Sequence, residues 1–559
     1  MKRSLFQIKK YFVHLLLVSI LALVSITGTS QATLILYNGK VFTSDKKQLW
    51  AEAIAIKGER IIAVGKNKEV LKFKVNGTKI INLEQHLVVP GFNDAHHHET
   101  PSDHSRVFSF KNGPFAPTSW EEARDSISAI VKKVPANILI TATINPDLLN
   151  DRRVRRKALD SIAPDNPVIL YAWTGHESIL NSAALKLIGY NDETTFIGGL
   201  LERDDEGKLS GLIEEYAEFQ IWSRLAQRLT LEQIAADIRS DYNTALSYGI
   251  TTDQVMTTGL TAQTFQKVFK ENDFGCRIRL MAFPFTDEKE FRVHDWDNMF
   301  HALNNKNYIS GVKMILDATP LDHGACMTKS YSSEPGNYGH LDFSEEQIRS
   351  YLKYCLANNQ QVIVHAVGDS SVNTLIKAMR SLHPDNFWRS RRVRIEHGEF
   401  AVMKPGDLKI LQQLGIMIVQ NPTHLSLPSV LNEMQENYVG RRSYLQPMRS
   451  LLDNNIPFGI GSDGPVNPFL NIMMATIHPD NPREAITLPE AVIAYTYGSA
   501  YAEFKEKEKG TLEKGKLADL AVLSQDIFTV NRNLLPATKS ILTMVGGKIF
   551  YDKKVLKMK

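Results

Sequence analysis

The chain has 559 residues, with 65 Lys and Arg against 61 Asp and Glu, which gives a formal net charge of +4. Hydrophobic residues make up 43% and charged residues 23%; this composition is typical of globular proteins and excludes a largely disordered, collagen-like or coiled-coil chain. The chain is long enough to bury a large core, and its three cysteines are too few for a disulfide scaffold.

The first 32 residues have the pattern of a secretory signal peptide. Basic residues are followed by an apolar run from Tyr11 to Val24 and by the triplet Ser30-Gln31-Ala32. We therefore expect cleavage after Ala32 and export, to a bacterial periplasm, with no membrane attachment of the mature chain. The alternative is an uncleaved N-terminal anchor. The only charged residues of the segment are Lys2, Arg3, Lys9 and Lys10. The mature chain is thus formally neutral, which argues against a nucleic-acid partner.

Short β-rich runs are predicted at both ends of the mature chain. In the segment 33–87, residues 34–37 and 41–43 flank the hairpin turn Asn38-Gly39. The segment 505–559 has the same character, with strands predicted at 520–523 and 543–545. We expect the two segments to form one small composite β-sandwich.

The long middle segment, 88–504, alternates helix-like and strand-like stretches. Thr230 to Gln233 is a capping box that begins a helix, and the extended run from Ile250 follows it. Ser344 to Gln347 begins another helix, followed by the apolar strand 361–364. This alternation predicts a parallel sheet covered on both faces. Residues 100–240 exceed what one strand–helix unit needs, so we expect an insertion there.

Five apolar runs carry a metal-capable residue. On an extended chain His96 and His98 point to the same side and His97 points away, so the first two can share a metal ion. The other four residues are Lys313, His365, His397 and Asp463. Each has an ordinary structural interpretation by itself, such as a hydrogen-bonded histidine or a turn aspartate. Their joint occurrence near strand ends favours one metal centre, because the functional residues of a closed barrel lie at the carboxyl ends of its strands.

The sequence resembles the amidohydrolase superfamily, and within it the YtcJ-like metal-dependent hydrolases of amidohydrolase family 3. The resemblance covers nearly the whole mature chain. The motifs that carry it are Pro90-Gly91-Phe92-Asn93-Asp94-Ala95-His96-His97-His98, Val312-Lys313, the segment from Gln361 to Asp369, Arg394-Ile395-Glu396-His397, the segment from Gln420 to His424, the segment from Gly461 to Val466, and the segment from Gly510 to Leu520.

The resemblance implies an α/β fold, a distorted (β/α)8 TIM barrel joined to the composite sandwich. It also implies a metal centre of two Zn2+ ions per chain, although other divalent metals are compatible with it. His96 and His98 match the ligands of one metal, and His365 and His397 match those of the second. Lys313 matches a lysine that is carboxylated by CO2 and bridges both ions. Asp463 matches the aspartate that contacts metal and transfers the catalytic proton.

The implied activity is metal-dependent hydrolysis of a carbon–nitrogen bond, other than a peptide bond, in a small-molecule amide. Zn2+ lowers the pKa of bound water toward about 7, and Asp463 would accept the water proton and pass it to the leaving group. A mononuclear deaminase, an ester or cyclic-amide hydrolase and a non-enzymatic exported binding protein are the alternatives. Lys313 counts against the mononuclear deaminase. The sequence leaves the oligomeric state open, including a homo-oligomer.

Other residues are expected to support the centre or bind substrate. Glu396 and Asp94 are candidates for orienting the ligands. The candidates for substrate binding are His176, His424 and Tyr331, and Trp173 is a candidate for the pocket wall; a structural role is the alternative for each. The chain also departs from the family pattern at Asn93, Ala318 and Gly464. We expect Asn93 to add a polar group near the metals and the other two to reshape the pocket.

Overall fold

The computed structural model describes residues 31–99, 106–437 and 445–558. Its centre is an eight-stranded sheet in which all paired neighbours are parallel. In chain order the strands are β8 (Phe92–His98), β15 (Ile250–Met256), β16 (Arg277–Ala282), β17 (Tyr308–Ile315), β18 (Val362–Ala366), β19 (Arg394–His397), β20 (Met417–Gln420) and β21 (Phe458–Ile460). This arrangement confirms the predicted distorted TIM barrel.

The barrel closes where β21 meets β8. The Asp463 N–H donates a hydrogen bond of 2.9 Å to the carbonyl of His96. The backbones approach so closely here that a Cβ on Gly461 would lie 2.4 Å from the Cβ of His96. Position 461 therefore requires glycine, and the seam places the loop after β21 directly beside the histidine pair of β8.

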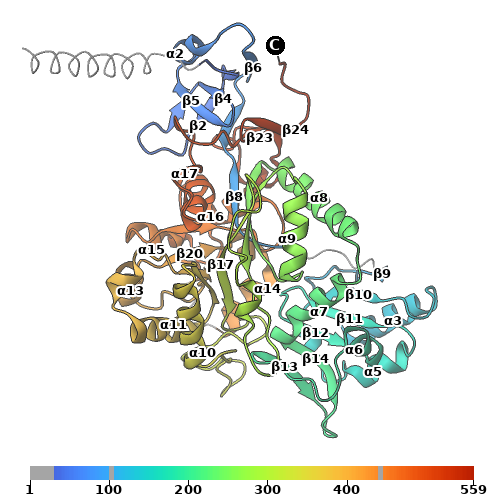
Figure 1. Cartoon of the computed structure of the whole chain (residues 1–559). Coiled ribbons are helices and arrows are strands. Elements are labelled where there is room, and N and C mark those ends of the chain that lie inside the picture. Colours follow the sequence, from blue (N-terminus) through green and yellow to red (C-terminus); the bar gives the residue numbers. More distant parts are fainter. Residues whose placement is uncertain (1–30, 100–105, 438–444, 559) are drawn as a thin grey trace, which may run out of the picture.

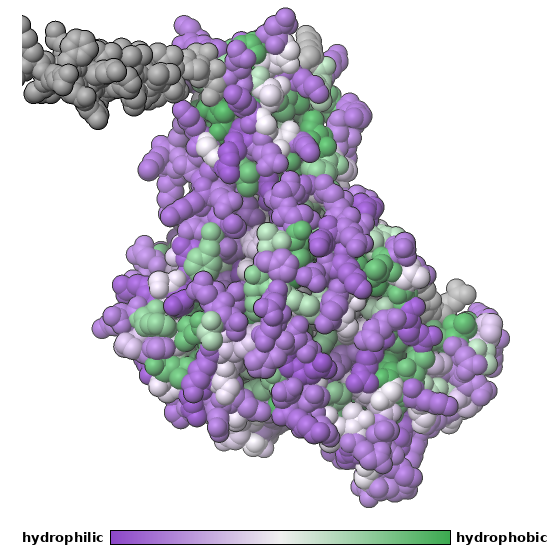
Figure 2. Space-filling view, in the orientation of Figure 1, coloured by the Kyte–Doolittle hydropathy of each residue, from purple (hydrophilic) through white to green (hydrophobic). Residues whose placement is uncertain are grey.

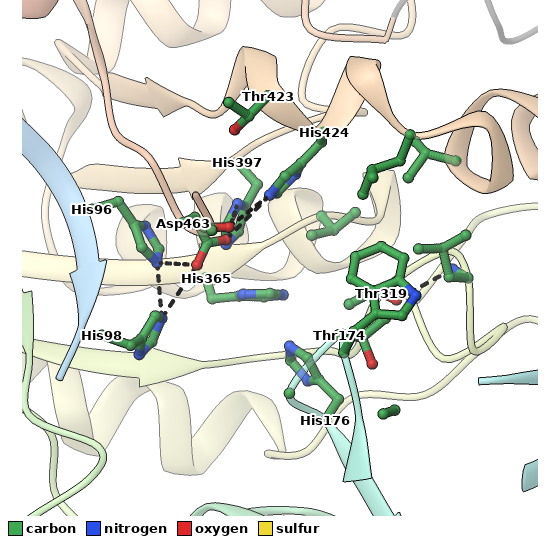
Figure 3. Close-up of a pocket in the computed structure, with 18 of the residues that line it drawn as sticks. His96, His98, Thr174, His176, Thr319, His365, His397, Thr423, His424 and Asp463 are labelled. Atoms are coloured by element: carbon green, nitrogen blue, oxygen red, sulfur yellow. Dashed lines mark hydrogen bonds and ion pairs between the residues drawn. The ribbon is translucent and has the colours of Figure 1, made fainter. Parts of the chain in front are cut away.

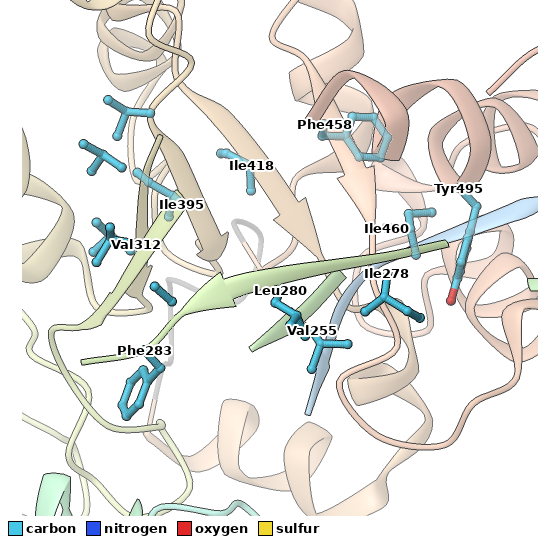
Figure 4. Packing of buried hydrophobic residues seen from close by; sticks show 14 of the residues in the cluster. Val255, Ile278, Leu280, Phe283, Val312, Ile395, Ile418, Phe458, Ile460 and Tyr495 are labelled. Atoms are coloured by element: carbon cyan, nitrogen blue, oxygen red, sulfur yellow. The ribbon is translucent and has the colours of Figure 1, made fainter. Parts of the chain in front are cut away.

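Helices cover the outside of the barrel (Figure 1). The capping boxes at Thr230 and Ser344 begin helices as predicted. Buried side chains such as Val255, Leu280 and Ile418 belong to the large hydrophobic cluster shown in Figure 4. The covering helices are α8 (Leu231–Ser247), α9 (Ala262–Glu271), α10 (Glu345–Ala357), α11 (Asp369–Leu382), α13 (Pro405–Leu414), α15 (Met448–Asp453), α16 (Pro468–Ile477) and α17 (Leu488–Ile493).

The two terminal segments form the predicted composite sandwich, at one end of the molecule (Figure 1). Strand β7 (Leu87–Pro90) pairs antiparallel with β22 (Leu520–Leu523), which joins the two ends of the chain in one six-stranded sheet. The other strands of that sheet are β2 (Lys40–Phe42), β3 (Trp50–Ala51), β23 (Ser540–Val545) and β24 (Lys548–Asp552). The facing sheet contains β1 (Leu34–Tyr37), β4 (Ala53–Lys57), β5 (Arg60–Gly65) and β6 (Lys79–Asn82).

A separate six-stranded sheet lies between β8 and β15 in the sequence, within the stretch where we expected an insertion. It forms a lobe beside the barrel (Figure 1). Its strands are β9 (Arg106–Val107), β10 (Ile140–Ile144), β11 (Val168–Ala172), β12 (Glu177–Leu180), β13 (Gly199–Arg203) and β14 (Leu209–Glu215). Its helices include α3 (Trp120–Val131), α5 (Arg156–Ile162), α6 (Ser182–Ile188) and α7 (Tyr216–Ala226).

The predicted signal segment 1–32 lies outside the described residues except for Gln31 and Ala32. Ala32 is buried, and its N–H donates to the carbonyl of Phe73. Among the described residues, no helix combines the length and apolar character needed to cross a membrane. The face shown in Figure 2 is largely hydrophilic, with scattered hydrophobic residues.

The structure places Asn93 in a buried network away from the histidine cluster. Its amide donates a hydrogen bond of 2.7 Å to Glu503, and it accepts one of 3.0 Å from Gln254. Glu503 also pairs with Lys509 at 2.8 Å. The prediction that Asn93 adds a polar group near the metals was therefore wrong. Asn93 lies near the start of β8, whereas His96 and His98 lie at its carboxyl end.

The buried pair of Glu503 and Lys509 predicts a large stability effect. Both side chains are at most 5% exposed, so Glu503→Gln leaves the Lys509 ammonium without its counter-charge. We expect the free energy of unfolding, measured by urea denaturation, to fall by about 3–5 kcal/mol. Glu508→Gln, at a half-exposed ion pair, is the control and should cost at most about 1 kcal/mol. Equal effects of the two substitutions would contradict the prediction.

Candidate metal centre

The carboxyl ends of the barrel strands bring the predicted ligands to one cavity of about 980 Å3. His96 and His98 lie on β8, Lys313 on β17 and the other two histidines at β18 and β19. Asp463 follows β21 across the seam. Figure 3 shows the four histidines and Asp463 converging. The six residues that the sequence singled out as ligands all line this cavity: His96, His98, Lys313, His365, His397 and Asp463.

His96, His98 and Asp463 form the first compact group. The Nε2 atoms of the two histidines are 3.2 Å apart, and each lies 3.5 Å from Oδ1 of Asp463. Two nitrogen ligands of a tetrahedral ion at 2.0–2.1 Å lie roughly 3.3 Å apart. The three residues therefore fit one divalent metal ion.

The second group contains His397 and also His424. Oδ2 of Asp463 lies 3.6 Å from Nδ1 of His397 and 3.5 Å from Nε2 of His424. The ring of His365 is 4.6 Å from that of His397, centroid to centroid, and its buried Nε2 has no hydrogen-bond partner in the described part of the chain. Asp463 thus lies between the two groups and can contact an ion in either.

Three of the histidines form a hydrogen bond through Nδ1. In His96 and His98 this leaves the Nε2 atoms facing each other, at the position that one metal ion would occupy. Nδ1 of His98 is 3.0 Å from the Thr258 hydroxyl, and Nδ1 of His397 is 2.9 Å from the Asn421 side-chain oxygen. His96 pairs through Nδ1 with the carboxylate of Glu396. Such outer hydrogen bonds fix the tautomer and orientation of metal-binding imidazoles, which supports the orienting role expected for Glu396.

Glu396 is itself held by Arg394 on the same strand. Although burial favours the neutral acid, the Arg394 guanidinium keeps the pKa of Glu396 below its usual range. Asp94 acts differently. It accepts a 2.7 Å hydrogen bond from the N–H of Ser462 and one from the Tyr495 hydroxyl. Asp94 therefore stabilises the barrel seam rather than orienting an imidazole ring.

Lys313 is the unusual group of the centre. Lys313 is 1% exposed, and its Nζ forms no hydrogen bond with the described residues. Burial lowers the pKa of this amine to about 8. A buried ammonium without a partner is costly, whereas a neutral amine can react with CO2 to give an anionic carbamate. The donor set therefore fits a metal centre with a bridging anion.

Two of the predicted residues have left-handed backbone conformations. The φ angle is 64° at His397 and 40° at Asp463. Such strain costs of order 1–3 kcal/mol and is concentrated at functional sites. Although burial opposes it, the neighbouring His96 and His424 hold the pKa of Asp463 well below its usual range. Asp463 is therefore an anion at neutral pH, as a metal ligand and proton acceptor must be.

The predicted substrate-binding residues differ in position. His176 and His424 both line the cavity, as does Trp173. His176 reaches it from the insertion lobe and is held by Glu215 at 3.0 Å. The prediction that Tyr331 binds substrate was wrong. Tyr331 is buried and does not line the cavity, and its hydroxyl donates a hydrogen bond to the carbonyl of Ala325. Tyr331 lies in the loop after β17, where no strand periodicity indicates which way a side chain points. Gly464 lines the cavity as expected of a residue that shapes the pocket, but Ala318 does not.

Several residues of the site were not predicted from the sequence. Glu399 lies 3.5 Å from Nδ1 of His424. Burial lowers the pKa of His424, but its contacts with Asp463 and Glu399 outweigh burial and raise it to about 10, so this imidazole is a cation at neutral pH. Arg394, which holds the predicted Glu396, was not predicted, although its position two residues earlier on the same strand was a usable signal. Of the aromatic side chains that the insertion lobe contributes to the cavity, Trp173 was predicted, whereas Phe219 and Trp222 were not.

Comparison with known proteins agrees with this geometry. The model of the amidohydrolase family matches residues 79–551, most of the chain. The chain belongs to the amidohydrolase family. It is a metal-dependent hydrolase that acts on carbon–nitrogen bonds, and the YtcJ-like subgroup predicted from the motifs is confirmed.

The similarity extends over the full length of individual relatives. The chain is 25% identical to the N-substituted formamide deformylase of Arthrobacter pascens, covering 94% of this chain and 99% of the relative. It is 24% identical to YtcJ of Bacillus subtilis, a protein named as an amidohydrolase, over 92% of this chain and 99% of the relative. A crystal structure of a metal-dependent hydrolase from Pyrococcus furiosus superposes with a TM-score of 0.67 at 21% identity, covering 89% of this chain and all of that one.

Proposed function

We propose that this amidohydrolase is an exported, binuclear zinc enzyme that hydrolyses small amides carrying an apolar substituent on nitrogen. The observation that carries the proposal is Lys313. Its amine is buried and unpartnered among the described residues, in the same cavity as the four candidate histidine ligands and Asp463. A carboxylated Lys313 would supply the two anionic oxygens that a pair of metal ions needs between them.

The ligands divide between two positions. His96 and His98 would hold one ion, and His365 and His397 the other, with carboxylated Lys313 bridging them. Asp463 would bind at the first position, where it is 3.5 Å from both Nε2 atoms. Imidazole and carboxylate ligands suit Zn2+ and related divalent ions.

The residues of the chain would carry the proton transfers. A bound divalent ion supplies a Lewis acid and lowers the pKa of a bound water molecule. Asp463, anionic and at the centre of the cluster, accepts the proton of the attacking water and donates it to the nitrogen of the leaving amine. His424 is a cation at neutral pH and is placed to hydrogen-bond the carbonyl oxygen or an acidic group of the substrate.

The composition of the cavity wall favours a substrate that carries an apolar substituent. Away from the histidines it is lined by Phe115, Trp173, Phe219, Trp222 and Leu425 among others, and such walls select apolar ligand parts. The formamide deformylase relative acts, by its name, on N-substituted formamides, which is compatible with this shape. The signal-like segment 1–32 suggests that the substrate is met outside the cytoplasm.

The test is a hydrolysis screen of protein loaded with Zn2+. We expect turnover of N-formyl and N-acyl compounds with aromatic or alkyl groups on nitrogen, at rates above those of matched compounds with charged groups. Cyclic amides and esters are included to distinguish the alternative hydrolases. Metal analysis should give at least two ions per chain, two of them in the catalytic centre. Fully loaded protein that hydrolyses none of the amides would overturn the proposal.

A further inference from the structure

A second group of metal-capable side chains lies behind the catalytic histidines. Nδ1 of His97 is 2.8 Å from Oδ2 of Asp253 and 3.8 Å from Oε1 of Glu99. The alternation of β8 turns the Nδ1 side of His97 away from His96 and His98, although part of the His97 side chain also borders the catalytic cavity. Asp253 comes from the neighbouring strand β15, and its Oδ2 also accepts a hydrogen bond of 2.9 Å from Tyr242 on helix α8. The group therefore joins two barrel strands on the side that faces a helix.

Two carboxylate oxygens of this group are buried and unsatisfied. Glu99 is 1% exposed and Asp253 is 2% exposed. Neither Oε1 of Glu99 nor Oδ1 of Asp253 has a hydrogen-bond partner within the described ranges. Leaving such oxygens without a partner is unfavourable, and native proteins rarely do so. Oε1 of Glu99 is also the oxygen that approaches His97.

The charges of the group do not balance. His97 is the only basic side chain that the described residues place in an ion pair with Glu99 or Asp253. Asp94 adds a third carboxyl group, because it lies directly opposite Asp253 in the pairing of β8 with β15. One imidazole thus pairs with two buried carboxyl groups, with a third on the neighbouring strand position, and a cation between Glu99 and Asp253 would supply the missing positive charge.

We propose that His97, Glu99 and Asp253 bind a divalent transition-metal ion, distinct from the catalytic ions, that ties β8 to β15. Their ligand atoms lie within 4.8 Å of one another, which requires only small side-chain movements to surround one ion. An imidazole nitrogen with two carboxylate oxygens favours Zn2+ or a similar ion over Mg2+ or Ca2+, which take oxygen ligands. The ion would replace the hydrogen bond between His97 and Asp253 and would brace the strand that carries His96 and His98.

The test counts metal ions in variants of the full chain. Metal-free protein is titrated with Zn2+, and bound metal is measured after removal of the excess. We expect Glu99→Gln to bind one ion fewer per chain than the wild type, whatever the occupancy of the catalytic centre. Glu232→Gln, on the same helix as Tyr242 but exposed, is the matched control and should bind as many ions as the wild type. A folded Glu99→Gln protein with the wild-type number of ions would overturn the proposal.

The location of the ion is tested independently of the variants. Crystals of zinc-loaded wild-type protein should show an anomalous peak between His97 and Asp253 in data collected at the zinc absorption edge. Absence of that peak overturns the proposal, and the group is then an ion pair with a shared proton. This measurement also decides the question if Glu99→Gln fails to fold. Neither readout involves substrate turnover, so failure here leaves the proposed amide hydrolysis unaffected.

Discussion

Lys313→Ala protein should lose at least one of the two metal ions of the catalytic centre and most of its activity. The substitution removes the side chain that we propose to supply the bridging anion, while the four histidines and Asp463 remain. A catalytic metal supplies several kcal/mol of transition-state stabilisation, so we expect kcat/KM for the best amide substrate to fall about 1,000-fold or more. The measurements are metal content per chain and steady-state kinetics.

The controls for Lys313 separate chemistry from folding. Lys353→Ala replaces an exposed lysine of helix α10 and should retain full metal content and activity. Wild-type protein purified from cells grown with 13C-labelled bicarbonate should show the NMR carbonyl resonance of a lysine carbamate. Lys313→Ala protein prepared in the same way should lack this resonance. A Lys313→Ala protein with full activity and one tightly bound metal in the catalytic centre would instead support the mononuclear alternative.

Asp463→Asn should lower kcat by about 100- to 10,000-fold, the range expected when a positioned proton acceptor is lost. The amide can still coordinate metal through its oxygen, so metal content should stay close to that of the wild type. Because Asp463 acts in proton transfer, we expect KM to change by less than a few fold. The contact with His424 weakens at the same time, since its partner loses the negative charge.

The pH profile distinguishes this role from a structural one. Only the deprotonated Asp463 accepts a proton, and its neighbours hold its pKa well below the usual range. The group is therefore ionised throughout the neutral range, and the loss in Asp463→Asn should be constant between about pH 6 and pH 9. Asp453→Asn, at a side chain that is 62% exposed, is the matched control. Recovery of the Asp463→Asn enzyme at high pH, or activity within tenfold of the wild type, would contradict the assignment.

The barrel and the positions of its candidate ligands could be predicted from the sequence because strands impose local rules. The side chains of His96 and His98 share a face through the two-residue period of an extended strand. His365 and His397 end apolar runs, and parallel strands bring such ends to one face of a barrel. These rules require only the order of residues along each strand, which the sequence contains.

The same rules failed where a residue's direction depends on distant partners. Asn93 is bound by Glu503, which lies 410 positions away in the chain. Tyr331 lies in a long loop whose path is set by contacts such as its bond to Ala325. His424 owes its charge to Glu399 and Asp463 together. No periodic pattern encodes such contacts, since they form only when separate elements pack.

By itself, the sequence determined the family, the barrel, the composite sandwich and the set of metal-capable residues. The tertiary structure decided how these residues are used. It placed Asp463 between two groups of histidines, buried Lys313 without a partner among the described residues, and turned His97 toward Glu99 and Asp253. The physical reason is that the pattern of a strand depends on neighbours along the chain, whereas burial, charge and ligand geometry depend on which strands and loops meet in space.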